Sequence, residues 1–238
     1  MAAGALIASS GALLAAAGAG LAYAVRGRSS ALFGPSVYHG DRGRRSLALT
    51  FDDGPSESTP LLLEYLAARN IKATFFMCGA NVDRLPEIAK AVADAGHEIG
   101  NHSDTHPRFD FHSEAFLYRE LAEAQRKIAQ ATGVEPKLFR APYGVRWFGL
   151  GAAQKRLDLL GVMWTVMGCD WKLPASKIAA RITRRARNGD IICLHDGRGL
   201  QAGPRIEETL GAVAAALPRL RQAGFQFETV SEILRSTS

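Results

Sequence analysis

The sequence has few of the features that mark a disulfide-stabilised or nucleic-acid-binding protein. It contains three cysteines, Cys78, Cys169 and Cys193, which lie in apolar runs without CxxC spacing, so free buried thiols are expected. The body of the chain has little net charge: residues 26–45 hold five Arg and one Asp, and so carry +4 of the net charge of +6. The remaining +2 is too small for the basic face that nucleic-acid binding requires, which excludes that partner.

Residues 1–25 have no charged side chain. About 20 apolar residues suffice to cross a bilayer, and the triplet Ala22-Tyr23-Ala24 fits a signal-peptide cleavage site. The segment is therefore predicted to be a signal peptide or a membrane anchor, with the domain that follows it outside the cytoplasm. The Arg-rich residues 26–45 are predicted to form a basic linker, and taken alone their charge favours a cytoplasmic location. Both alternatives stand.

Residues 46–235 are predicted to form a single domain. Short apolar runs alternate there with helical patterns, which indicates an α/β fold with parallel strands. Seven such units predict a barrel close to the (β/α)₈ type, but one unit short of it. The expected strands are residues 46–51, 73–77, 97–100, 138–140, 162–166, 190–194 and 225–230.

Ionisable residues follow five of these strands, at the end of an α/β barrel where active sites form. Asp52 and Asp53 come directly after the first strand. Two adjacent carboxylates after a buried strand are costly unless a metal ion or a cation compensates them. One could bind a metal while the other faces water; alternatively, the pair could simply cap the helix that begins near Pro60.

His102 and His106 are spaced i, i+4, which would place both on one face of a helical turn. Two imidazoles and one carboxylate make three ligands and leave a position open for water, as in catalytic metal sites. The residue after His102 is Ser103 rather than the Glu of metalloproteases, so Asp52 is the natural candidate for the general base. HxxxH spacing alone also occurs without any metal.

Two further residues, His195 and Arg140, have both a structural and a functional interpretation. His195 could be a buried core histidine, but Asp170 is expected at a neighbouring strand end, and a carboxylate beside an imidazole suits a general acid. Arg140 could be a structural ion-pair partner or could hold Asp52 ionised. The tryptophans Trp147 and Trp164 are expected to pack in the core or in loops.

Five segments together resemble a known family. TFDDGP (50–55), HSDTH (102–106), RAPYG (140–144), DW (170–171) and LHD (194–196) are similar, in order and spacing, to the motifs of the polysaccharide deacetylases, the NodB-homology family. This family includes chitooligosaccharide, chitin, peptidoglycan and acetylxylan deacetylases. The resemblance spans about residues 37–234, and one position departs from the pattern: Met167 stands where many members have another Asp.

The resemblance implies a distorted (β/α)₇ barrel. It also implies a metal-dependent hydrolase that removes acetyl groups from the N-acetylated, or O-acetylated, sugars of a cell-wall or chitin-like polysaccharide. It implies a divalent metal, zinc first, with iron, cobalt, manganese or nickel as alternatives. The implied roles follow the motifs: Asp53, His102 and His106 as metal ligands, Asp52 as general base, Arg140 as its orienting partner, His195 as general acid tuned by Asp170, the backbone N–H of Tyr143 in the oxyanion hole, and Trp171 and Leu194 around the acetyl group.

Three other functions compete with this one. A related fold could hydrolyse a cyclic or simple amide that carries no sugar. A catalytically silent domain could bind glycans at a membrane without cleaving them. A non-haem iron oxygenase also uses two His and one carboxylate, but it has no evident use for Asp52 or for the pair Asp170 and His195.

Overall fold

Strand β2 (Ser46–Gly54) is the central strand of the molecule. In the computed structural model of the protein, which describes residues 15–235, every residue of β2 is buried. Its sequence, SLALTFDDG, is mostly apolar and does not alternate with charged residues before its last three positions, as expected for a parallel strand that is covered on both faces. Strand β8 pairs with β2 along one edge, while β3 and β9 share the other edge.

The described residues contain one sheet of nine strands, in which every strand pairing is parallel. Its order is β1-β6-β5-β4-β3-β2-β8-β7, with β9 beside β2. The other strands are β1 (Ser36–Val37), β3 (Thr74–Met77), β4 (Glu98–Asn101), β5 (Leu138–Phe139), β6 (Leu160–Val162), β7 (Val166–Met167), β8 (Asp190–His195) and β9 (Gln226–Glu228).

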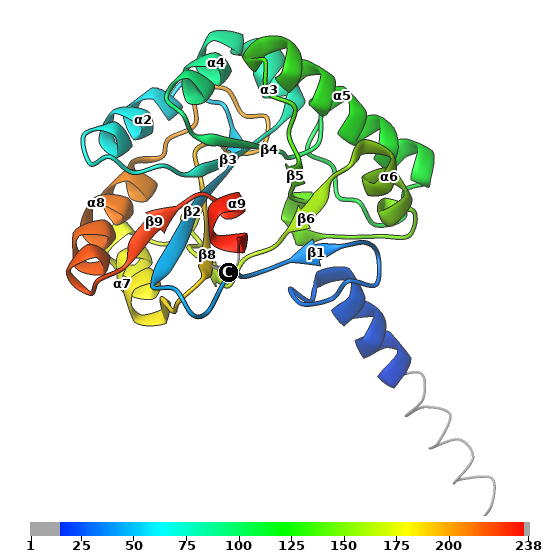
Figure 1. Cartoon of the computed structure of the whole chain (residues 1–238). Helices are drawn as coiled ribbons and strands as arrows, with labels where there is room; N and C mark the ends of the chain where they lie inside the picture. Colours follow the sequence, from blue (N-terminus) through cyan, green and yellow to red (C-terminus); the bar gives the residue numbers. More distant parts are fainter. Residues whose placement is uncertain (1–14, 236–238) are drawn as a thin grey trace, which may run out of the picture.

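Helices cover the outer face of the curled sheet, and the short helix α9 lies inside its curve (Figure 1). A large apolar core packs the outer helices onto the sheet, while a smaller cluster that includes Val230 and Ile233 of α9 fills the inside. This is the predicted distorted (β/α)₇ barrel. The helices are α2 (Thr59–Ala67), α3 (Gly79–Arg84), α4 (Pro86–Asp94), α5 (Glu114–Thr132), α6 (Leu150–Leu157), α7 (Ala175–Arg185), α8 (Glu207–Gln222) and α9 (Val230–Leu234), with a 3₁₀ turn η1 at Pro142–Gly144 and a further helix that includes residues 15–26.

The fifth predicted strand, residues 162–166, is two strands in the structure. β6 ends at Val162 and pairs with β5 and β1, whereas β7 begins at Val166 and pairs with β8. Three residues therefore carry the chain across the gap between the two sides of the curled sheet. The break frees backbone carbonyls, and buried carbonyls need donors. Arg140 donates to the carbonyls of Val162 and Met163, and Arg28 donates to the carbonyl of Thr165.

The predicted linker is also different in the structure. Residues 33–45 belong to the folded domain: β1 pairs with β6, and Arg42 forms an ion pair with the buried Asp190 at 2.6 Å. The prediction of a linker over 26–45 is wrong for this part, because apolar residues such as Phe33 are buried there among the arginines. Among residues 15–235, no helix is long and apolar enough to span a bilayer; most of the predicted signal or anchor, residues 1–14, lies outside the described residues.

Replacement of Phe33 tests whether this segment is part of the domain. The side chain is 6% exposed and packs edge-on against Phe148, whereas its neighbour Leu32 is 72% exposed. We expect Phe33→Ala to lower the free energy of unfolding by about 3 kcal/mol, the typical cost of emptying a buried aromatic site. Leu32→Ala is the matched control and should change stability by less than about 0.5 kcal/mol. Urea unfolding measures both, and equal, small effects would mean that the segment is not packed on the domain.

Candidate active site

Polar residues from several strand ends surround one cavity of about 520 Å³. Seven of the residues singled out from the sequence line it: Asp52, Asp53, His102, His106, Tyr143, Trp171 and His195. Arg140 and Asp170 are buried behind them and contact two of them directly. Residues 52 and 195 are direct neighbours across β2 and β8, since Asp52 pairs with His195 in the register.

A β-bulge explains how two consecutive aspartates face the same cavity. Successive residues of a regular strand point to opposite faces, but the register of β2 against β3 shifts between Asp52 and Gly54. Asp53, the extra residue, adopts the left-handed conformation with φ 73°. The loop after β8 lies against this bulge: a Cβ on Gly197 would come within 2.3 Å of the Asp53 carbonyl oxygen. Glycine is therefore required at 197 for Asp53 to keep its position.

The Oδ1 atom of Asp53 lies 3.3 Å from Nε2 of His102 and 3.0 Å from Nε2 of His106. His102 holds its Nδ1 atom 2.8 Å from the backbone oxygen of Arg140, which can only accept, so its proton is on Nδ1 and its Nε2 presents a lone pair. Asp53 Oδ1 is buried and has no hydrogen-bond partner. A buried carboxylate oxygen facing an imidazole lone pair needs a cation between them, so these residues fit a divalent metal.

The same imidazoles favour the ionised form of Asp53 when no metal ion is bound and their Nε2 atoms carry protons. Burial of the carboxyl group opposes its ionisation, but His102 and His106, where they donate towards Oδ1, and the charge of His195 hold the pKa of Asp53 well below its ordinary value. Its second oxygen, Oδ2, accepts a hydrogen bond of 2.8 Å from the backbone N–H of Gly199. Asp53 is thus an oriented anion.

The two histidines do not lie on a helical turn, and that prediction is wrong. Residues 102–106 form a loop in which Ser103 and His106 both have positive φ, 66° and 57°. The loop is tied to α5, because the buried Glu120 accepts hydrogen bonds from the backbone N–H and the hydroxyl of Thr105 at 2.8 and 2.9 Å. The i, i+4 spacing brings the imidazoles together, with ring centroids 5.1 Å apart, through loop geometry instead of a helix.

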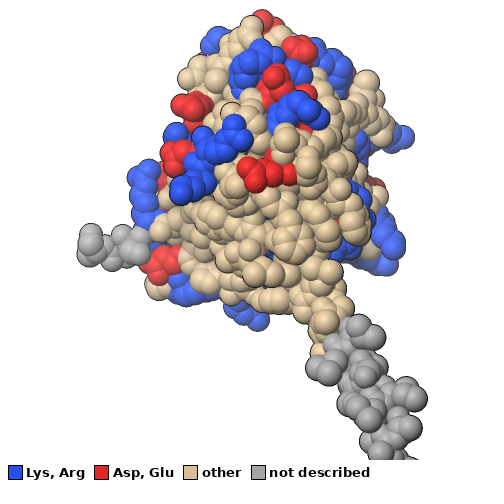
Figure 2. All heavy atoms as spheres, turned by 90° about the vertical axis from the view of Figure 1, so that its right-hand side faces the viewer, with Lys and Arg blue, Asp and Glu red and all other residues tan. Residues whose placement is uncertain are grey.

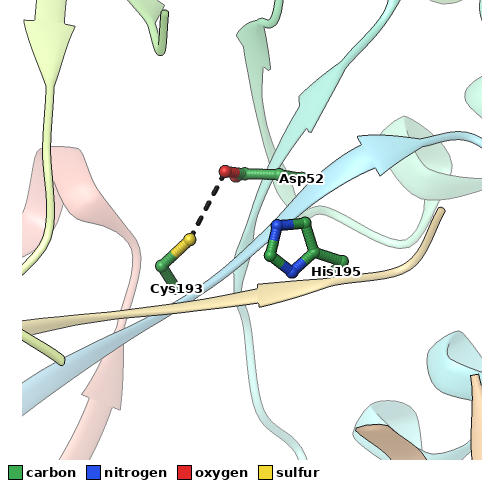
Figure 3. Close-up of side chains that lie close together, drawn as sticks. All are labelled: Asp52, Cys193 and His195. Atoms are coloured by element: carbon green, nitrogen blue, oxygen red, sulfur yellow. Dashed lines mark hydrogen bonds between the residues drawn. The ribbon is translucent and has the colours of Figure 1, made fainter. Parts of the chain in front are cut away.

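Asp52 is held by two donors. Arg140 Nη1 donates to its Oδ1 at 2.6 Å, and the Cys193 thiol lies 3.4 Å from its Oδ2 (Figure 3). Arg140 is fully buried and also donates to the hydroxyl of Thr50 at 2.7 Å. An unpaired charge at such a site would be strongly unfavourable, so each member of the pair holds the other in its ionised form.

His195 and Asp170 form a buried pair on the opposite side of Asp52. The Asp170 carboxylate accepts hydrogen bonds from Nδ1 and the backbone N–H of His195, both at 2.8 Å, and from the hydroxyl of Thr209 on α8 at 2.7 Å. Burial favours the neutral imidazole, but Asp170, with help from Asp53 and Asp52, raises the pKa of His195 to about 9. The ring is therefore protonated at neutral pH.

Other cavity residues differ from the sequence-based expectations. The side chain of Leu194 is fully buried in the main apolar core, and the β8 side chains in the cavity are those of Cys193 and His195. Strand alternation predicts this, because Cys193 is two residues from His195. Trp164, expected to pack in the core or in a loop, also lines the cavity, as does Met167, which departs from the family pattern. Arg26, Arg198 and Gly199, which no motif marked, line it too.

Two aromatic residues flank the ionisable groups. Tyr143 adopts the left-handed conformation in η1, with φ 57°, and its ring centroid lies 4.7 Å from that of His106. Trp171 stands edge-on to His195 with ring centroids 5.1 Å apart, and it is half exposed. Both rings are thus positioned to contact a molecule that enters the cavity.

Comparison with known proteins decides the family. A model of the family "Polysaccharide deacetylase" matches residues 39–159. The chain is 36% identical over 193 residues to a peptidoglycan-N-acetylglucosamine deacetylase of Bacillus cereus, an alignment that covers 79% of this chain and 88% of the relative. The chain belongs to the polysaccharide deacetylase family. The family and the enzyme class predicted from the five motifs are confirmed.

Another relative and a solved structure are also similar to this polysaccharide deacetylase. A chitooligosaccharide deacetylase of Bradyrhizobium is 32% identical, over 85% of this chain and 97% of the relative. The crystal structure of a carbohydrate esterase family 4 pseudoenzyme of Bacillus anthracis superposes with a TM-score of 0.78 and 27% identity, covering 86% of this chain and 70% of that one. The same fold thus occurs with and without catalysis. Activity therefore has to be inferred from the residues of the site, not from the fold.

Replacement of Asp170 tests the electrostatic coupling to His195. In Asp170→Asn the imidazolium loses its main stabilising charge while burial still favours the neutral ring. We expect the pKa of His195 to fall from about 9 towards or below its ordinary 6.5. An NMR titration of the His195 ring in the metal-free protein measures this shift. An unchanged pKa in the variant would show that Asp170 does not control the charge of His195.

Proposed function

We propose that this polysaccharide deacetylase removes acetyl groups from N-acetylglucosamine units of a cell-wall polymer, with peptidoglycan as the first candidate. The observation that supports it best is the unpartnered Oδ1 of Asp53, aimed at Nε2 of His102 and His106. This ligand set lies in one cavity with the ion-paired Asp52 and the protonated His195. The relatives deacetylate peptidoglycan and chitooligosaccharides by name, and both polymers contain N-acetylglucosamine.

Asp53, His102 and His106 would hold a divalent metal, for which we propose zinc; two imidazoles and a carboxylate also accept iron, cobalt, manganese or nickel. When bound, such an ion polarises the acetyl carbonyl group and acidifies water. The three side chains leave the remaining coordination positions open towards the cavity, as catalytic sites require.

The other residues would move protons and stabilise charge. Asp52 accepts the proton of the attacking water, and Arg140 keeps it ionised and aimed at the cavity. The backbone N–H of Tyr143 donates to the acetyl oxygen as that oxygen gains negative charge, which is commonly a large part of catalysis. His195 delivers its proton to the departing amine, and Asp170 keeps that proton in place until then. Acetate and the free amino sugar are the products.

The substrate is tested by acetate release. We expect release from N-acetylglucosamine oligomers or peptidoglycan, no comparable release from acetylated xylan, loss of activity with a chelator, and recovery on addition of zinc. Hydrolysis of simple amides in place of the glycans would favour the amidohydrolase alternative. Glycan binding without acetate release would favour the silent domain, and full activity of a verified metal-free preparation would contradict the metal dependence.

Two neighbouring carboxylates with different roles allow a sharp test. Asp53→Asn should weaken metal binding, so that activity partly returns at high metal concentration. Asp52→Asn should retain metal but lose its proton acceptor, with a fall in kcat of about 10²–10⁴-fold that metal does not reverse. Metal content and metal-titrated rates of the two purified variants decide between them. If Asp52→Asn purifies without metal and is rescued by it, the two roles are reversed.

We also propose that the domain works outside the cytoplasmic membrane, where cell-wall polymers lie. The apolar segment 1–25 ends beside the cavity: Arg146 donates to the carbonyls of Gly27 and Ser30, its backbone N–H bonds to Val25, and Arg26 lines the cavity. Figure 2 shows an uncharged region next to the point where the described N-terminal segment leaves the domain. A retained anchor would therefore hold the cavity close to the bilayer.

A fusion of residues 1–45 to a reporter that is active only outside the membrane tests this location. Signal is expected, because the apolar segment should direct export. The matched control carries charged residues in place of apolar ones within residues 5–15 and should be silent. Silence of the native fusion, with signal from a cytoplasmic reporter, would show that the arginines of residues 26–45 govern the topology.

A further inference from the structure

Cys193 is the cavity residue with the least explained position. It is buried, it is a free thiol, and it lines the same cavity as the metal ligands. Figure 3 shows its sulfur turned towards the carboxylate of Asp52, with the ring of His195 beside both. None of the roles proposed above uses this thiol.

The ligand atoms of Asp52, Cys193 and His195 lie within 4.8 Å of one another. Zinc–sulfur bonds of about 2.3 Å and zinc–oxygen or zinc–nitrogen bonds of about 2.0–2.2 Å place a sulfur and an oxygen or nitrogen ligand of one tetrahedral ion about 3.5–3.7 Å apart. The Cys193 Sγ to Asp52 Oδ2 distance of 3.4 Å is slightly shorter than this range, so a small movement of either side chain would let both atoms bind one ion. The Nδ1 atom of His195 is engaged by Asp170, which leaves Nε2 as the atom that can bind an ion.

We propose that Asp52, Cys193 and His195 form a second metal site, distinct from the Asp53, His102 and His106 set, whose occupation inhibits the enzyme. The combination of thiolate, imidazole and carboxylate selects soft or borderline ions such as zinc. Binding displaces the protons of the thiol and the imidazolium to solvent, as metal binding to such ligands generally does. An ion there occupies both the proposed proton acceptor, Asp52, and the proposed proton donor, His195.

Only the proposed second site has a sulfur ligand, so spectroscopy can distinguish the two sites. Cadmium, the heavier congener of zinc, gives a near-ultraviolet charge-transfer band only when a thiolate is a ligand. The Asp53, His102 and His106 set has no sulfur, so the band reports the second site alone and does not depend on any substrate. If the proposed deacetylase activity were not found, the cadmium band would still report whether the second site binds metal.

The experiment is a titration of the full-length protein with Cd²⁺, followed in the near ultraviolet. The band is expected in the wild type and in the control Cys169→Ser, whose thiol is half-buried and does not line the cavity. It should be absent in Cys193→Ser, which keeps a small hydrogen-bond donor beside Asp52. His195→Ala should weaken Cd²⁺ binding at Cys193. This variant tests the imidazole ligand while the thiol stays in place. No band in the wild type, or a band that persists in Cys193→Ser, would overturn the site.

The inhibitory effect is tested with excess Zn²⁺ in assays of acetate release, each variant being compared with its own rate at low zinc. Loss of an outer partner of a metal ligand already costs about 10–100-fold in affinity. Loss of the thiolate ligand itself should therefore raise the inhibitory zinc concentration at least tenfold in Cys193→Ser and leave it unchanged in Cys169→Ser. A cadmium band in the wild type without any inhibition by zinc would overturn the inhibitory role.

Discussion

The fully buried guanidinium group of Arg140 links the barrel to the active site. It donates to Asp52 at 2.6 Å and, across the break between β6 and β7, to the carbonyls of Val162 and Met163. The backbone carbonyl of the same residue fixes the tautomer of His102 at 2.8 Å. Because removing one partner of a buried ion pair costs several kcal/mol, the position of Asp52 and the end of β6 depend on this single side chain, while the backbone of the same residue orients His102.

Each buried anion of the site has a cation of its own, which is why two adjacent carboxylates are tolerated. Asp52 is paired with Arg140, and Asp170 with His195. Asp53 has only imidazoles beside its Oδ1 atom, and the proposed metal ion would supply its compensating charge. The bulge at Asp53 separates the two neighbours into these different environments, and chemically identical side chains thereby acquire different properties.

Much of this arrangement could be predicted from the sequence, because parallel strands bring their carboxyl ends to one rim. The motifs placed Asp52, Asp53 and His195 at strand ends, and the register of β2 against β8 sets Asp52 beside His195. The predictions that were wrong concern local sequence patterns that are compatible with two different backbone conformations. The i, i+4 histidines are compatible with a helical turn and with a loop, and the positive φ of His106 depends on the contacts of that loop with α5, which the local sequence does not contain.

The interpretations of Leu194 and Cys193 show a different limit. The family resemblance assigned Leu194 to the acetyl group, whereas strand alternation from His195 placed Cys193 on the cavity face, and the structure agrees with the alternation. A motif transfers the positions that relatives share, but the side chains between them follow the periodicity of this chain. The periodicity of β8 places the Cys193 sulfur 3.4 Å from the proposed proton acceptor, and with the proposed second site, metal ions would both support and inhibit the reaction.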